Sequence, residues 1–169
     1  GVTPQTNDKF RLDGHLDGVS LSIAFPNHRM FYALRRECTD VEWVVLIISD
    51  KVLWKKECAF CRHNAADARI RCQPLPHLKT EEAFLDMFEE IKGLPSREEQ
   101  RLKIFDPTDD QAEVLTFDII EPNLIGGAVF QNAAAQKQYR DLLGDRRTFI
   151  HAEGCGMFAS RGYKRLYGP

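Results

Sequence analysis

Residues 109–115 read Asp-Asp-Gln-Ala-Glu-Val-Leu and run from a polar loop directly into an apolar strand, expected over residues 112–119. Successive side chains of a strand point to opposite faces, so Glu113 and Leu115 share one face and Val114 lies on the other. A carboxylate at the start of a buried strand costs free energy unless it is paired or functional. Two interpretations stay open: a working carboxylate, or a glutamate in solvent at the edge of a sheet.

The segments around this strand mix strands and helices without regular alternation. Further strands are expected at residues 19–24, 43–48, 124–130 and 148–150, and helices at residues 28–38, 80–92, 96–102 and 132–143. The all-apolar run at 43–48 predicts a fully buried strand, and the glycine-rich tail predicts a loop. The glycine pair at 126–127 suggests a bulge or a close backbone approach. The pattern favours an α+β fold with a mostly antiparallel sheet over a doubly wound parallel fold.

The chain has 169 residues, of which 43% are hydrophobic and 28% charged. This is typical of one globular domain and argues against disordered, collagen-like and coiled-coil proteins. No apolar run approaches the ~20 residues of a membrane helix, and the start lacks the features of a signal peptide. Five cysteines, an odd number, favour a reduced protein of the cytoplasm with free thiols and no membrane contact.

Charge is distributed unevenly along the chain. Residues 137–169 carry seven Lys or Arg against three Asp or Glu, whereas residues 1–136 carry 16 against 22. An excess of positive charge near the C-terminus is typical of proteins that bind a polyanion. The alternative is an ordinary solvated surface.

Two other groups of residues have chemistry of their own. Arg29, Arg35 and Arg36 could bind a pyrophosphate in a bidentate way, although an exposed helix face is the simpler interpretation. The other group consists of cysteines and histidines, which are the residue types that bind zinc. Its last two members, Cys72 and His77, lack the repeated spacing of a structural zinc site, so free thiols are favoured. Its members are Cys58, Cys61, His63, Cys72 and His77.

Five segments follow one another in an order that is typical of one family. They are residues 7–15 (NDKFRLDGH), 20–32 (SLSIAFPNHRMFY), 43–46 (WVVL), 58–66 (CAFC through NAA) and 110–115 (DQAEVL). Through them the sequence resembles the DarT family, the DNA ADP-ribosyltransferase toxins of bacterial toxin–antitoxin systems. The QAEVL and NAA motifs are the most specific.

The resemblance implies an ADP-ribosyltransferase-like fold, a split and mostly antiparallel β core with surrounding helices, as one domain over residues 1–169 that lacks a short N-terminal segment of the family. It implies transfer of ADP-ribose from NAD, used as a substrate and without a metal, to a base of single-stranded DNA. Thymine and guanine both stay open as the base. The implied partners are single-stranded DNA and a macrodomain antitoxin. A non-catalytic relative that binds single-stranded nucleic acid is the alternative.

The resemblance also assigns roles to particular residues. Glu113 matches the catalytic glutamate and Arg29 the essential basic residue. Truncation of Glu113 is expected to abolish transfer and preserve the fold, since a strand-start glutamate should be accessible. Those expected to contact NAD are Ser22, Phe25, Arg29 and Tyr32, and those expected to contact DNA are Asn64, His63, Arg146 and Arg147. Aromatic residues of the tail that would suit base stacking are Phe149, Phe158, Tyr163 and Tyr167.

Overall fold

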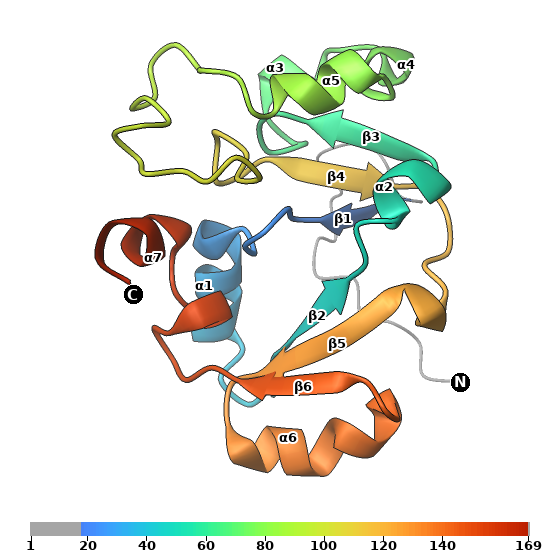
Figure 1. The fold of residues 1–169 in the computed structure, drawn as a ribbon, viewed down its shortest axis with the longest axis vertical. Coiled ribbons are helices and arrows are strands. Elements are labelled where there is room, and N and C mark those ends of the chain that lie inside the picture. The colour runs from blue at the N-terminus through green and yellow to red at the C-terminus, as the bar shows by residue number, and fades with distance from the viewer. Residues whose placement is uncertain (1–17, 169) are drawn as a thin grey trace.

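The computed structural model describes residues 18–168, so the expected segment at 7–15 lies outside the described residues. Its strands form two three-stranded sheets (Figure 1). The first sheet has the order β1-β4-β3, with β1 at Val19–Leu21, β4 at Glu113–Thr116 and β3 at Cys58–Cys61. The second has the order β2-β5-β6, with β2 at Val44–Ile48, β5 at Ile125–Phe130 and β6 at Arg147–Ile150. All pairs are antiparallel except β5–β6, which confirms the mostly antiparallel α+β fold.

Seven α-helices surround the sheets within residues 18–168. They are α1 (His28–Glu37), α2 (Val52–Lys55), α3 (Ala68–Arg71), α4 (Leu75–Leu78), α5 (Glu81–Asp86), α6 (Ala133–Tyr139) and α7 (Arg161–Tyr167). Figure 1 shows α3, α4 and α5 beside β3, α6 beside β6, and α1 and α7 on one flank. Short 3₁₀ turns lie at Pro122–Leu124, Arg140–Leu143 and Gly156–Phe158. No helix in this part of the chain is long and apolar enough to cross a membrane.

The core covers both faces of the first sheet. Val114 packs with Cys58 and Phe60 in one buried cluster, and Leu115 packs with Ala59 and Cys61 in another. The alternation expected for residues 113–115 is therefore confirmed. This burial on both sides removes apolar side chains from water and holds β4 in the middle of its sheet.

The strand predicted at 43–48 exists, but the prediction that it is fully buried is wrong. Val44, Leu46 and Ile47 of β2 are exposed. Among the described residues, β2 is an edge strand whose one partner is β5. An apolar run fits an edge strand as well as a central one, so its composition does not reveal which faces are covered.

The glycine pair in β5 behaves as expected. A Cβ on Gly127 would lie 2.5 Å from the backbone oxygen of Arg147, so only glycine allows β6 to pair this closely. The register between β2 and β5 also shifts, between Ile47 and Ile48.

Two helix predictions and one loop prediction differ from the structure. The helix expected at 80–92 ends at Asp86, because the Met87 carbonyl accepts a hydrogen bond from the Thr108 backbone instead of continuing the helix. Residues 96–102 form turns, where the Arg97 guanidinium binds the backbone carbonyls of Lys103 and Asp106. The tail is not a loop throughout, since α7 forms there behind a serine cap at 160.

Candidate active site

Glu113 lies at the end of the first sheet where three segments meet. It begins β4 and is paired with Cys61, the last residue of β3. On its other side Leu21, the last residue of β1, pairs with Val114. Because both pairs are antiparallel, β1 and β3 leave the sheet at the end where β4 enters it. Tertiary structure therefore brings Ser22 and Asn64, from two separate predicted site segments, to the end that carries Glu113.

The Glu113 side chain is buried and held by two donors. The residue is 5% exposed. Asn64 Nδ2 donates to Oε1 at 2.8 Å, and the Ala65 backbone N–H donates to Oε2 at 3.2 Å. The expectation of an accessible glutamate is therefore wrong. These bonds fix the orientation of the carboxylate, because each of its oxygens accepts from a different donor of the same loop.

The Asn64 side chain is oriented by its own loop. Its Oδ1 accepts a hydrogen bond from the Ala66 backbone N–H at 3.0 Å, and its carbonyl accepts one from the Asp67 backbone N–H at 2.9 Å. Such turns are a local preference of asparagine. With its oxygen bound to Ala66, the amide presents its NH₂ group to Glu113.

The neighbouring His63 does not face solvent. Its Nδ1 lies 2.6 Å from Asp109 Oδ2, and the side chains are 6% and 11% exposed. The other Asp109 oxygen accepts a hydrogen bond from the Gln111 backbone N–H at 2.8 Å. His63 is thus engaged within the protein. Sequence analysis did not single out Asp109, because nothing local marks it as a histidine partner.

The residues expected to contact NAD fall into two groups. Ser22 and Phe25 line a cavity of about 420 Å³ between the segment Ser20–Pro26 and the segment Val45–Leu53. Val114 also lines the cavity, whereas Arg29, Tyr32 and Glu113 are not among the described residues that do. The cavity therefore opens on the β4 face opposite to Glu113.

Arg29 and Tyr32 lie on α1, which follows β1 after the segment 22–27. Burial and the Arg35 charge lower the pKa of His28, the first residue of α1, while the Asp110 and Glu153 charges oppose this shift. Asp110 precedes Glu113 by three residues, so the charge of the loop before β4 acts on the first residue of α1.

The three arginines of α1 differ in what they contact. Within residues 18–168, the Arg29 guanidinium is exposed and has no hydrogen-bond or ion-pair partner. Arg35 is buried, where it pairs with Glu153 and donates to the Phe158 carbonyl. Arg36 donates to the Tyr32 hydroxyl at 3.4 Å. Arg29 and Arg36 are both exposed, but Arg29 is the one whose guanidinium is not engaged by another side chain in this part of the chain.

The loop before Asp109 is held by α7. Arg165 binds both oxygens of Asp106, at 2.6 and 2.8 Å, and Arg161 donates to the carbonyls of Pro107 and Thr108. Burial raises the pKa of Asp106, but the bonds from Arg165 and from the Lys103 backbone N–H outweigh it, so the pKa lies below its usual value. These contacts were missed in the sequence because α7 was expected to be a loop.

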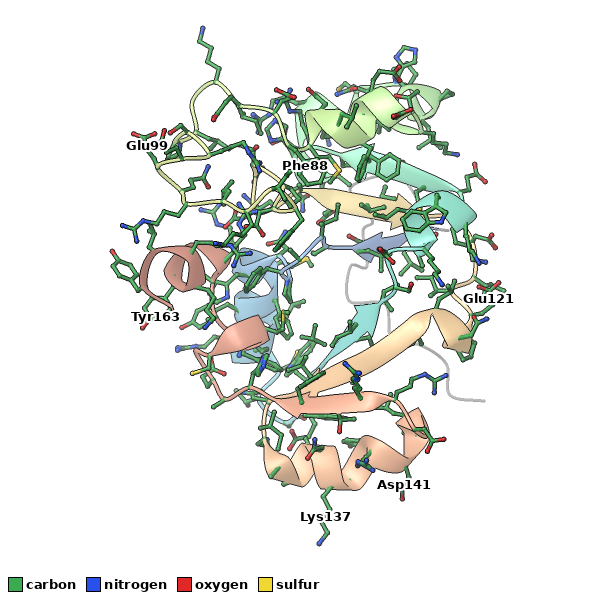
Figure 2. The ribbon with its side chains drawn as sticks, in the orientation of Figure 1. Phe88, Glu99, Glu121, Lys137, Asp141 and Tyr163 are labelled. Atoms are coloured by element: carbon green, nitrogen blue, oxygen red, sulfur yellow. The ribbon has the colours of Figure 1, made fainter. Side chains whose placement is uncertain are left out.

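Some basic and aromatic side chains of the tail contact the rest of the protein, and others are exposed to solvent. The Arg146 guanidinium donates to the backbone carbonyls of Ile125, Leu143 and Pro122, whereas Arg147 is exposed. Phe158 is buried and Phe149 is exposed. Tyr163 and Tyr167 on α7 are 57% and 74% exposed, with ring centroids 5.6 Å apart. Figure 2 shows Tyr163 projecting away from the molecule.

Cys58 and Cys61 lie in different clusters, on opposite faces of β3. They therefore do not converge on one metal ion, and the zinc interpretation of this pair is wrong. Burial raises the pKa of the Cys58 thiol, which disfavours the reactive thiolate. Among residues 18–168 no group of three or more His, Cys, Asp or Glu side chains could hold a metal ion.

Comparison with protein-family models gives a match over most of the chain. The model is described as DarT, ssDNA thymidine ADP-ribosyltransferase, and it matches residues 19–157. The matched range contains the α1 segment, the Asn64 loop and Glu113. The comparison with curated proteins finds no match.

Proposed function

This chain belongs to the DarT family of ssDNA thymidine ADP-ribosyltransferases, and we propose that it transfers ADP-ribose from NAD to thymidine with Glu113 as its catalytic carboxylate. The observation that supports this role best is the pair of donors that hold the Glu113 carboxylate at the sheet end where the three segments meet. The family description also narrows the base, which sequence analysis left open, to thymidine.

Glu113 would act on both reactants. Breaking the bond between nicotinamide and ribose develops positive charge on the ribose, as in glycoside hydrolysis. A fixed carboxylate stabilises that charge and binds a ribose hydroxyl. The base of thymidine carries one N–H, at N3, because N1 is bonded to deoxyribose. As the new N3–ribose bond forms, the same carboxylate accepts the N3 proton and nicotinamide departs with the electron pair of the broken bond.

The chain offers two features that fit NAD. The unpaired Arg29 guanidinium suits the pyrophosphate, since arginine binds phosphate oxygens in a bidentate way. The cavity lined by Ser22 and Phe25 has a volume within the range of small-molecule sites. Because it opens on the β4 face opposite to Glu113, it is proposed to hold a part of NAD other than the reacting ribose. Tyr32, exposed on α1, is proposed as a further contact.

Replacing Arg29 with alanine should raise the KM for NAD about 10- to 100-fold, because a hydrogen bond to a charged group contributes roughly 1.5–3 kcal/mol. The measurement is nicotinamide release against NAD concentration. Lys92→Ala, at an exposed cation outside α1, is the control and should leave the KM unchanged. Equal effects of the two substitutions would remove Arg29 from the NAD site.

Exposed aromatic and basic residues of the tail are proposed to hold the DNA strand beside the target base. Replacing both Tyr163 and Tyr167 with alanine should weaken binding of a single-stranded oligonucleotide by about 1–3 kcal/mol per stacked base. Fluorescence anisotropy at two salt concentrations measures this, and Arg147→Ala should also reduce the salt dependence. Tyr139→Ala, on α6, is the control. A loss as large for Tyr139→Ala would contradict the proposed site.

The proposed reaction is tested by mass spectrometry of single-stranded oligonucleotides after incubation with the protein and NAD. An ADP-ribosyl adduct is expected on oligonucleotides that contain thymidine and not on matched ones without it. Salt-dependent binding without adduct or nicotinamide release would instead support a non-catalytic relative.

The same activity suggests the role and partner of this protein. An enzyme that modifies DNA bases blocks replication of its own host, so we propose that it is the toxin of a toxin–antitoxin system in the cytoplasm. Its proposed partner is an antitoxin with a macrodomain that removes ADP-ribose. Co-expression with such a partner should restore growth and erase the adduct.

A further inference from the structure

A side-chain bond joins the loop that follows β3, which carries Asn64, to the loop that precedes β4. It lies beyond the last residue pair of β3 with β4. That last pair is Cys61 with Glu113. His63 lies two residues beyond β3, Asp109 lies four residues before Glu113, and the 2.6 Å bond between their side chains connects the two loops. Both side chains are almost fully buried.

Both residues of this bond lie next to parts of the chain that set the position of Glu113. His63 directly precedes Asn64 and Ala65, the two donors to the Glu113 carboxylate. Asp109 closes the turn into β4, because its Oδ1 accepts from the Gln111 N–H and its carbonyl from the Ala112 N–H. The bond between His63 and Asp109 thus connects the loop that holds the Glu113 carboxylate with the turn that leads into β4.

We propose that the His63–Asp109 pair is a positioning device for the Glu113 carboxylate. Strand ends open more readily than strand centres, since fewer bonds hold them. A reacting carboxylate has to be held within about 0.5 Å of its productive geometry. The bond between His63 and Asp109 restrains the separation of the two loops at the point where ladder hydrogen bonds end. His63 and Asp109 touch no substrate in this role, which rests on the proposed function of Glu113.

The kinetic test compares His63→Leu, which removes the donor, with His63→Asn, which keeps an N–H close to the Nδ1 position. His63→Leu is expected to lower kcat about 10- to 100-fold, as displaced reacting groups do, with the KM for NAD unchanged. His63→Asn should recover most of the rate. His77→Leu, in α4, is the matched control and should keep the wild-type kcat. Wild-type kcat in His63→Leu, or no recovery in His63→Asn, would overturn the inference.

A second test does not depend on activity. Hydrogen exchange of the Ala65 amide, which donates to Glu113, should be faster in His63→Leu and in Asp109→Leu. Exchange of the Gln111 amide, which donates to Asp109, should be faster in His63→Leu. Amides that pair β2 with β5 should exchange as in the wild type. Unchanged exchange at Ala65 and Gln111 would disprove the positioning role even where the wild-type enzyme is active. An inactive wild type with faster exchange in the variants would instead refute the proposed function and leave the pairing intact.

Discussion

Replacing Glu113 with glutamine should lower the rate of ADP-ribosyl transfer at least ~100-fold, which is the usual loss when one electrostatic stabiliser of a transition state is removed. The glutamine keeps the size of the side chain but carries neither the negative charge nor the proton-accepting ability of the carboxylate. The rate is measured as adduct on a thymidine-containing oligonucleotide and, independently, as released nicotinamide. Transfer at the wild-type rate would exclude Glu113 from catalysis.

The same substitution should also destabilise the fold. Asn64 Nδ2 and the Ala65 N–H are both donors, so the NH₂ group of glutamine has to face one of them. The lost hydrogen bond is expected to cost about 1–3 kcal/mol, because a buried donor then lacks its partner. Urea unfolding measures it. Ile70→Val, in the cluster beside Glu113, should cost roughly 0.5–1.5 kcal/mol and retain transfer, which separates loss of chemistry from loss of stability.

Replacing Asp106 with alanine should produce the largest loss of stability, about 3–5 kcal/mol, as is typical when one partner of a buried ion pair is removed. Asp106 is 0% exposed. Without it Arg165 loses both bonds, and the Lys103 N–H loses its acceptor. Urea unfolding at neutral pH measures the change. Asp118→Ala breaks an exposed pair with Lys56 and should cost far less. Equal losses for the two variants would contradict a special role of Asp106.

Asp106 should also make stability depend on acid pH. Its pKa is lower in the folded protein than in the unfolded chain, so its ionised form is favoured by folding. Its contribution is fully present above the usual aspartate pKa of about 3.9. It is lost as pH falls below that value and through the lower pKa of the folded state. Asp106→Ala should therefore lose less stability than the wild type does as pH falls below about 4.

Local signals in the sequence were sufficient for several elements. The Asn27 cap and the apolar face after it predict α1, and the structure places the helix there, with Asn27 accepting from the Met30 N–H. The alternation at 113–115 predicts which side chains of β4 face which cluster. Caps and alternation involve residues a few positions apart, so sequence proximity is enough to reveal them.

Other elements depend on contacts between distant segments. α7 forms in a glycine-rich tail because Arg161 and Arg165 are anchored to residues 106–108. Three side chains of β2 are exposed, because the burial of a strand depends on which distant segments pack on its faces. α5 stops early because Thr108 binds the Met87 carbonyl. Propensity is a weak prior that such tertiary contacts override.

For the candidate site, the sequence by itself determined the chemical groups: the glutamate after the polar loop, the Asn-Ala-Ala motif and the arginine after the first strand. Tertiary structure decided what they contact. Asn64 reaches Glu113 across 49 positions of sequence, and His63 reaches Asp109 across 46. The reason is physical. The antiparallel register of β3 with β4 sets which loops meet at the sheet end, and a shift of one residue would turn Glu113 to the other face.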